Sequence, residues 1–469
     1  MNGINSVSAM STVASNRLRA SIAFAVMAAL LLLVGVGQSW SLALAIFNLC
    51  LISAVMSLGV NIQWGYAGLF NVGIMGFAAL GGVAAVLVSK APVAGAWAAG
   101  GSGLLLAAAC GIATIAGAVL LRRRLPKGRL RLVCMGALIA LGYFAVRYFY
   151  DPAVAAIEAV NPAKHGYLGG LGLPVIVSWA VGGLFAAGAA WVVGKVVLGL
   201  RSDYLAIATL GISEIIIAFL KNEDWLARGV KNVTGLARPV PYEIDLQQTP
   251  WFIDVVEKMN ATELASLATE AKIDILHKLV IDYSSLFVKL CYTGLFAGVL
   301  AVILALSTAA LNSPWGRMMR AIRDNDVSAN AMGKNITARH RQVFILGSAV
   351  IGIGGAMLTT LDGQFTPGSY NPLRFTFLIW VMVIVGGSGN NLGAVLGGFL
   401  VWFFWVEAEP AGLWLIDNAT GWLGEDSAVR IHLMNSAQHM RLFLMGLVLL
   451  LVMRFSPGGI LPEVVRRPK

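Results

Sequence analysis

The stretch NSPWGRMMRAIRDNDVSANAMGKNITARHR, residues 312–341, decides how this chain must be arranged. It carries six Lys/Arg and two Asp between long apolar segments, although charged residues make up only 12% of the 469 residues. Hydrophobic residues make up 58% of the chain, whereas soluble domains contain roughly 45–50%. We therefore expect an integral membrane protein whose segment 312–341 lies in water on one side of the membrane.

Twelve apolar runs are candidate membrane spans, because a helix needs about 20 apolar residues to cross the hydrocarbon core. The runs are continuously apolar, which predicts helices rather than the alternating strands of a barrel. The predicted fold class is all-α, a polytopic transmembrane helix bundle of about 10–12 spans with some broken or re-entrant helices. The runs lie at about residues 21–37, 41–60, 65–89, 100–121, 132–150, 173–194, 204–220, 284–311, 342–361, 374–389, 391–410 and 441–455.

Basic residues predict the orientation of the bundle. If the N-terminus with Arg17 and Arg19 is cytoplasmic, counting the spans puts every basic cluster on that same side, as the positive-inside bias requires. This bias accounts for the net charge of +11, so we expect membrane lipids and no nucleic acid as partners. The prediction is a multi-pass protein of the bacterial inner membrane with both termini in the cytoplasm. The other clusters are Arg122–Arg131, Lys195 with Arg201, the segment 312–341, and the tail Arg454–Lys469.

The same count divides the chain into N-terminal transmembrane helices (1–220), an extracytoplasmic loop (221–283) and C-terminal transmembrane helices (284–469). The part of the loop from Lys221 to Asp282 holds seven Lys/Arg and ten Asp/Glu, unlike the basic loops of the other side. Its residues 254–278 predict an amphipathic helix that either caps the outer mouth or docks an extracytoplasmic partner. The predicted apolar stripe consists of Val255, Met259, Leu264, Leu267, Ala271 and Leu276.

Glycine-rich segments that carry polar residues at membrane depth are candidates for a translocation pathway. In NIQWGYAGLFNVGIMGF (61–77), the four glycines Gly65, Gly68, Gly73 and Gly76 are expected to share one helix face. The alternative is a tight helix crossing whose amides bond to neighbouring helices. Gln364, within GQFTPGSYNP (363–372), is a further candidate at an outer helix end. The candidates within 61–71 are Asn61, Gln63, Gly65, Tyr66, Gly68 and Asn71.

Two further features stand out at membrane depth. The composition of VGGSGNNLG (385–393) predicts a tight turn or a junction between broken helices. Glu214 is the main charged residue within a predicted span, and such a residue is costly in lipid and often functional. Alternatively, Glu214 lies near the outer end and hydrogen-bonds to a neighbour.

Enzyme and cofactor signatures are absent from the sequence. There is no GxSxG, no HExxH and no Walker A sequence, and the four cysteines lie in apolar stretches without CxxC spacing. We therefore expect a transport protein rather than an enzyme, with no metal or cofactor of its own and no means of hydrolysing ATP.

The segment 312–341 has the pattern of an ordered helix. Ser313-Pro314 is typical of a cap followed by a first-turn proline, and Gly333 is placed to end a helix. One helix is therefore predicted over Trp315–Met332. A short helix in water, surrounded by arginines, is a shape that another protein can grip.

Several motifs in order along the chain resemble the permease subunits of ATP-binding-cassette importers for branched-chain amino acids, the LivM type in particular. The resemblance implies a homologous LivH-like permease subunit, two cytoplasmic ATP-binding subunits that use the ATP, and a periplasmic substrate-binding protein as partners. The motifs are SLGVNIQWGYAGLFNVGIMGFAALGG (57–82), SDYLAIATLGISEII (202–216), GRMMRAIRDNDVSANAMGKN (316–335), FILGSAVIGIGGAM (344–357), IVGGSGNNLGAVLGG (384–398) and RFSPGGILP (454–462).

The resemblance also implies that residues 316–335 form a coupling loop, which the ATPases move to open the pathway. The outer motif of many relatives is reduced here to Val233–Leu236. Urea, short amides and other amino acids are therefore alternative substrates. A stand-alone secondary transporter or channel is a further alternative, and a membrane-embedded enzyme is disfavoured by the absent motifs. The residues that match the coupling pattern are Ala321, Arg323, Asp324, Ala329 and Gly333.

Overall fold

The computed structural model describes residues 2–162, 166–265, 269–424 and 427–463. Helices form nearly all of the regular structure in these ranges, whereas strands β1 (Val233–Thr234) and β2 (Gln364–Phe365) form one two-residue antiparallel pair. The predicted all-α class is confirmed. The helices at the centre of the bundle are α2 (Trp40–Ala67), α3 (Ile74–Ser89), α7 (Val175–Val197), α16 (Ile336–Asp362), α17 (Pro372–Gly386) and α18 (Asn391–Thr420).

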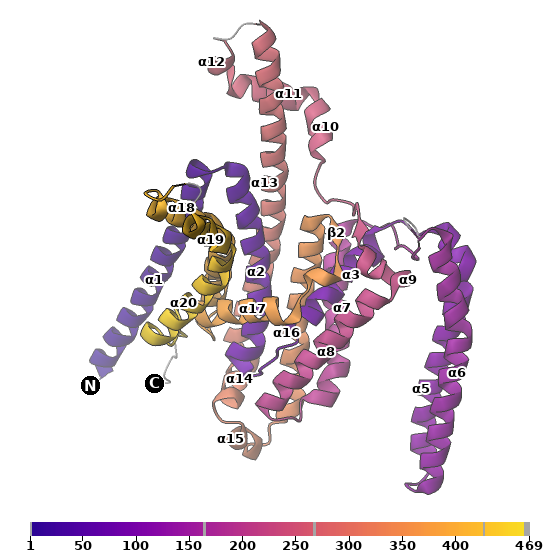
Figure 1. The fold of residues 1–469 in the computed structure, drawn as a ribbon. Helices are drawn as coiled ribbons and strands as arrows, with labels where there is room; N and C mark the ends of the chain where they lie inside the picture. Colours follow the sequence, from indigo (N-terminus) through magenta and orange to yellow (C-terminus); the bar gives the residue numbers. More distant parts are fainter. Residues whose placement is uncertain (1, 163–165, 266–268, 425–426, 464–469) are drawn as a thin grey trace.

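Other long helices pack around this centre or stand away from it (Figure 1). The remaining long helices are α1 (Asn2–Gly37), α5 (Ser102–Arg124), α6 (Arg129–Val160), α8 (Ser202–Asn222), α13 (Thr269–Asn312) and α20 (Met440–Phe455). The short elements are α4 (Ala94–Ala96), η1 (Trp97–Gly101), α9 (Asp224–Ala227), η2 (Gly229–Lys231), α10 (Glu243–Gln248), α11 (Pro250–Met259), α12 (Ala261–Leu264), α14 (Pro314–Asp324), α15 (Asp326–Ala331), η3 (Pro367–Ser369), α19 (Ala428–Ser436) and η4 (Ala437–His439).

Within the described residues, nine helical spans are long and apolar enough to cross a membrane, or ten if the bent α19–α20 pair is counted as one span. The chain is therefore a multi-pass membrane protein. Two predicted spans, 65–89 and 374–389, correspond instead to the shorter apolar helices α3 and α17. The span 65–89 is wrong at its start, because α2 continues to Ala67 and residues 68–73 are not helical. These short helices fit the expected broken or re-entrant elements.

Glycines let three central helices touch at their backbones. An added Cβ at Gly81 of α3 would lie 1.8 Å from the carbonyl oxygen of Gly352 on α16. A Cβ at Gly182 of α7 would lie 3.0 Å from the Cα of Gly81. Small residues permit this approach, which brings dispersion contacts between helices in place of contacts with lipid. We call these three residues the glycine junction.

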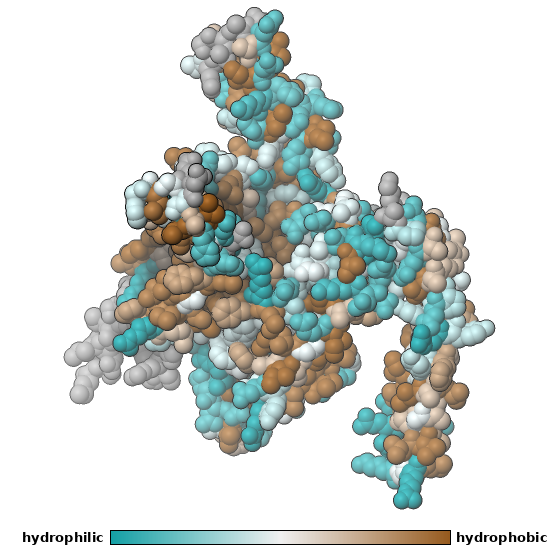
Figure 2. Space-filling view, viewed as in Figure 1, coloured by the Kyte–Doolittle hydropathy of each residue, from teal (hydrophilic) through white to brown (hydrophobic). Residues whose placement is uncertain are grey.

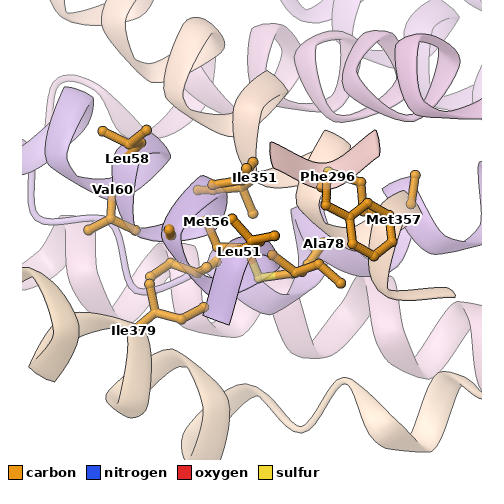
Figure 3. Close-up of a cluster of buried hydrophobic side chains, with 14 of the residues drawn as sticks. Leu51, Met56, Leu58, Val60, Ala78, Phe296, Ile351, Met357 and Ile379 are labelled. Atoms are coloured by element: carbon orange, nitrogen blue, oxygen red, sulfur yellow. The ribbon is translucent and has the colours of Figure 1, made fainter. Parts of the chain in front are cut away.

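Apolar side chains fill the spaces around these crossings. They come from α2, α3, α13, α16 and α17, and they are nearly inaccessible to solvent. Figure 3 shows this cluster, with Leu51, Met56, Leu58, Val60, Ala78, Phe296, Ile351, Met357 and Ile379 labelled. The core of the molecule therefore lies between α2 and α16, close to the polar residues of 61–71.

The bundle has two polar ends, which we call the α15 end and the β2 end after the elements they hold. Figure 1 shows the N-terminus, the α5–α6 turn and α14–α15 at one end, and α10–α12 beyond the other. Figure 2 shows hydrophilic surface around α14–α15 and at the tip of the α5–α6 hairpin, with hydrophobic surface between the ends. This arrangement agrees with the expectation that the basic clusters of these segments lie on one side of the membrane. Residues 464–469 of the basic tail lie outside the described residues, and the side of the membrane stays a prediction.

The amphipathic helix expected over 254–278 is wrong as a single element. The chain forms α11, then α12, and α13 begins only at Thr269. The predicted stripe is misplaced on α11, because Phe252 and Val256 are buried there while Val255 and Met259 are exposed. Leu267, another predicted member of the stripe, lies outside the described residues.

Candidate functional site

The segment 312–341 forms two short helices rather than the single predicted one. Helix α14 ends at Asp324, and α15 starts at Asp326 after one extended residue, Asn325, with φ −158° and ψ 96°. The side chain of Asn325 accepts a hydrogen bond of 2.9 Å from the backbone N–H of Ser328. Asparagine is a common N-cap, and Asn325 caps α15 in this way. The cap requires an extended backbone at Asn325, which interrupts the single helix that was predicted.

The predicted start and end of the segment are confirmed. Pro314 occupies the first turn of α14, although the hydroxyl of Ser313 donates back to the carbonyl of Ala310 instead of capping α14. Gly333 has φ +76°, the left-handed conformation that glycine adopts most readily. The N–H of Lys334 donates to the Ala329 carbonyl at 3.2 Å, which closes a Schellman-type helix end.

The two helices differ in exposure. Helix α14 contacts α2 and α13, and its Gly316, Met319 and Ile322 are buried. Helix α15 has no buried residue, and Val327 is 75% exposed. Met332, just after it, is 79% exposed. The α15 end therefore exposes two apolar side chains, Val327 and Met332, among polar residues.

Four of the five predicted coupling residues face outward or lie at the margin of the segment. Ala321, Asp324 and Gly333 are exposed, and Ala329 is half-buried. The fifth, Arg323, turns inward and is described next.

Arg323 joins α14 to two other parts of the chain. Its Nη1 donates to the carbonyl of Gly65, near the end of α2, and to Glu463 Oε2 at 2.8 Å. Its Nε donates to Asp324 Oδ1 at 3.1 Å. Burial, the largest single effect, opposes the charge of the guanidinium, but the hydrogen bonds and charges of Glu463 and Asp324 together raise the pKa of Arg323. Arg323 therefore contacts the bundle, and its role in coupling stays a prediction.

Asn391 is the centre of a buried hydrogen-bond cluster next to this contact. Its Oδ1 accepts from Asn61 Nδ2 at 3.1 Å and from the Tyr66 hydroxyl at 2.9 Å. Its Nδ2 donates to Thr308 Oγ1 at 3.2 Å. Asn61 Oδ1 accepts from the backbone N–H of Gly389 at 2.9 Å. The cluster therefore ties α2 to the α17–α18 turn and to α13.

Gln63 and Asn71 form a second buried set on the other side of α2. Gln63 Nε2 donates to the Phe344 carbonyl at 2.9 Å and to Ser348 Oγ at 3.1 Å. Asn71 Nδ2 donates to Gln63 Oε1 at 2.8 Å, and Asn71 Oδ1 accepts from the N–H of Gly73. The structure thus shows the hydrogen-bonded alternative for these amides. Their role in a pathway stays a prediction.

The glycines of 61–76 do not share one helix face, contrary to the expectation, because the helix breaks after Ala67. Gly65 packs against Gly389, and Gly68 has φ +68° beside Arg323. Gly73 and Gly76 instead meet Thr209 and Ser213 of α8. A single helical periodicity was the wrong assumption for this stretch.

Gln364 lies far from the other predicted pathway residues. It is exposed in β2, where it pairs with Thr234 of the outer motif, whereas Phe344 beside Gln63 lies near the opposite end of α16. The 18 residues of α16 that separate Phe344 from Asp362 correspond to about 27 Å. Close to this strand pair, Lys90 Nζ donates to the Gly235 carbonyl at 2.8 Å, and burial lowers the pKa of Lys90. The structure does not bring the seven pathway candidates into one site.

Glu214 lies on the exposed face of α8. The opposite face packs on the start of α3, where Thr209 and Ser213 accept hydrogen bonds from backbone N–H groups. Glu214 has no hydrogen bond or ion pair within the described ranges, so the alternative of a hydrogen bond to a neighbouring helix is not found there. The same ranges contain no group of three or more His, Cys, Asp or Glu that could hold a metal ion.

Four residues that matter at the α15 end were missed from the sequence: Asn391, Glu463, Val327 and Met332. The GNN motif signalled the turn at 385–393, which the structure confirms between α17 and α18, but it did not indicate that Asn391 joins three helices. Glu463 was counted within a basic tail. The exposure of Val327 and Met332 could not be predicted, because residue type alone does not tell an exposed apolar side chain from a buried one.

Comparison with known proteins assigns this arrangement to a family. The family described as "Branched-chain amino acid transport system / permease component" matches residues 132–453. The high-affinity branched-chain amino acid transport system permease protein LivM of Escherichia coli (strain K12) is 24% identical over 332 residues, which cover 70% of this chain and 65% of the relative. LivM of Salmonella typhimurium (strain LT2) gives the same identity and coverage.

A shorter match extends this likeness to an archaeon. The probable branched-chain amino acid transport permease protein LivM of Methanocaldococcus jannaschii is 27% identical over 159 residues, covering 33% of this chain and 41% of that protein. The matched part of the chain spans slightly less than two thirds of the two bacterial relatives. No solved structure matches the chain. Because the family match covers more than half of the 469 residues, the chain belongs to the LivM-type permease components of branched-chain amino acid transport systems.

Proposed function

We propose that this chain is the membrane-spanning permease subunit of an ATP-driven importer for branched-chain amino acids. The family membership and the names of the relatives support the substrate class. Two cytoplasmic ATPases use the ATP, a periplasmic binding protein delivers the substrate, and a homologous LivH-like permease completes the membrane part. The α15 end faces the cytoplasm of a bacterial inner membrane.

The observation that carries this proposal is the contact made by Arg323. The exposed α15 supplies a surface for an ATPase, and Arg323 connects the adjoining α14 to α2 and to Glu463. Next to this contact, Asn391 ties α2 to α13 and α18. A displacement of α14–α15 by an ATPase is therefore passed to the central helices as a rigid-body movement.

The exposed face of α8 is an argument that a second membrane subunit is present. A carboxylate that faces hydrocarbon in the middle of a spanning helix is costly, and Glu214 has no described partner in this chain. In the proposed transporter, this face meets the homologous permease or the aqueous pathway between the two subunits.

The test separates two steps: docking of the ATPase on this chain, and transmission of its movement to the central helices. The full complex is reconstituted in proteoliposomes with its ATPases and binding protein. Met332→Gln removes an exposed apolar contact, and we expect about tenfold less co-purifying ATPase. Arg323→Gln leaves the docking surface in place, so we expect normal co-purification but about tenfold slower ATP-dependent leucine uptake.

Arg317→Gln is the matched control, because Arg317 is exposed on the same helix and, among the described residues, its side chain hydrogen-bonds only to the Asn312 carbonyl. It should retain both co-purification and uptake. Uptake by the wild type without ATP, driven by a proton gradient, would show that the chain is a secondary transporter. If all three variants match the wild type, the coupling role of α14–α15 is wrong.

A further inference from the structure

A cavity of about 870 Å³ lies between α17, α18 and α20, separate from the α15 end. Apolar side chains form most of its wall, including Phe377, Trp405 and Met445. Three charged side chains also reach it: Arg374 from α17, Glu409 from α18 and Arg441 from α20. The cavity is therefore apolar with one charged zone.

The charged zone has an excess of positive charge. Arg441 Nη2 pairs with Glu409 Oε2 at 2.6 Å, while the Nε of Arg441 is buried without a hydrogen-bond partner among the described residues. Arg374 stacks on the Trp405 ring, with its guanidinium carbon 4.8 Å from the centroid. The guanidinium of Arg374 forms no hydrogen bond or ion pair within the described part of the chain, and the backbone N–H of Arg374 donates to Asn371 Oδ1 at 3.1 Å. One full positive charge and a free N–H donor thus remain for a ligand.

The charged zone lies level with the end of the membrane spans. Gln38, in the turn that follows the span Leu18–Gly37, donates to Glu407 at 2.9 Å, and Glu407 is two residues before Glu409. Arg374 and Arg441 both lie in the first turn of their helices, so the partial positive charge of two helix N-termini adds to the zone. This depth corresponds to the lipid headgroups.

The part of the cavity wall that Phe377 and Leu442 form leads away from the charged zone, toward the hydrocarbon. Phe377 is one helical turn beyond Arg374 and is 52% exposed, and Leu442 beside Arg441 is 64% exposed. An acyl chain that lies along these side chains would cover apolar surface while its headgroup reaches the two arginines.

We propose that this cavity binds the phosphodiester headgroup of an anionic membrane phospholipid, with Arg374 and Arg441 as the phosphate ligands. Two guanidinium groups are suited to phosphate, because each offers a planar fork of N–H donors. The volume and the mixed wall favour an amphiphile over a small hydrophilic anion. Glu409 orients Arg441 and limits the positive charge of the site.

The test measures the lipid retained by the full chain, purified in detergent and examined by native mass spectrometry after addition of phosphatidylglycerol or phosphatidylcholine. Wild type should retain phosphatidylglycerol preferentially. Arg374→Gln and Arg441→Gln should each lower this retention about tenfold, since each removes a charge-assisted hydrogen bond. Glu409→Gln removes the competing carboxylate and should raise retention, which tests the site even if an arginine variant folds poorly.

Arg454→Gln is the matched control, because Arg454 is exposed near the opposite end of α20, and its lipid retention should equal that of wild type. Inorganic phosphate at millimolar concentration should not displace the lipid. Displacement by phosphate alone would show that the site takes free anions. Equal phosphatidylglycerol retention by wild type and both arginine variants would overturn the proposal, as would loss of the lipid when a second membrane subunit binds.

Discussion

The helices that meet at the glycine junction (α3, α7 and α16) and those of the α5–α6 hairpin are built from similar sequence but occupy different environments. Both are apolar and rich in glycine and alanine, and both satisfy the length required of a span or approach it. Yet in α16, which holds Gly352, 67% of the apolar window is buried, against 6% in the segment Ala94–Arg124 that contains α5. Figure 1 shows the hairpin standing away from the central helices.

The difference lies in what each glycine meets. At the junction, Gly81 and Gly352 bring two backbones together, whereas Gly136 of α6 has open space where a Cβ would lie. Glycine is therefore required at the junction and merely tolerated at Gly136, whereas Gly142 of the hairpin packs against the Thr114 side chain of α5. The apolar side chains of the hairpin face outward, and lipid or a partner subunit covers them in a membrane.

The largest effect on stability is expected from a substitution at the glycine junction. Gly81→Ala places a Cβ against the backbone of α16, which no side-chain rotation can relieve, so we expect a loss of about 3 kcal/mol in the free energy of unfolding. The measurement is thermal or denaturant unfolding in detergent. Gly188→Ala on α7 is the matched control, because nothing lies within 4 Å of its Cβ position. Equal stability of the two variants would show that the junction is looser than described.

A medium effect is expected at Asn391, which extends the comparison from packing to hydrogen bonding. Asn391→Leu leaves Asn61 Nδ2 and the Tyr66 hydroxyl without their acceptor in the core, for a loss of about 2 kcal/mol. The same unfolding measurement applies. Asn418→Leu, on the exposed end of α18, should cost much less. An unchanged stability for Asn391→Leu would instead favour the pathway role predicted for Asn61 and Tyr66.

The smallest effect is expected in the hairpin. Gly136→Ala meets no atom and improves helix propensity, so it should stabilise the chain by less than about 1 kcal/mol. Unfolding in detergent followed by circular dichroism would detect the direction of the shift. A clear destabilisation would mean that α6 packs against another helix at this glycine and that the two regions are less different than they look.

Several features of the site were predictable because they depend on neighbours in the sequence. Pro314 and Gly333 marked the ends of the segment 312–341, since their backbone preferences are local. The break at Asn325 was missed, although asparagine is a common helix cap, because the residues on both sides of it favour helix. The inward turn of Arg323 was not predictable, because it depends on Glu463, 140 residues away.

The sequence by itself determined that the chain is a polytopic helical membrane protein, where its polar segments lie, and which family it resembles. Hydropathy and charge decide these points, because they set the free energy of each segment in water and in lipid. Only the tertiary structure decided which apolar helices form the centre and which face outward. Lipid tails and protein interiors are equally apolar, so hydropathy does not separate the glycine junction from the hairpin. The close contact between backbones and the buried amide hydrogen bonds distinguish the two regions.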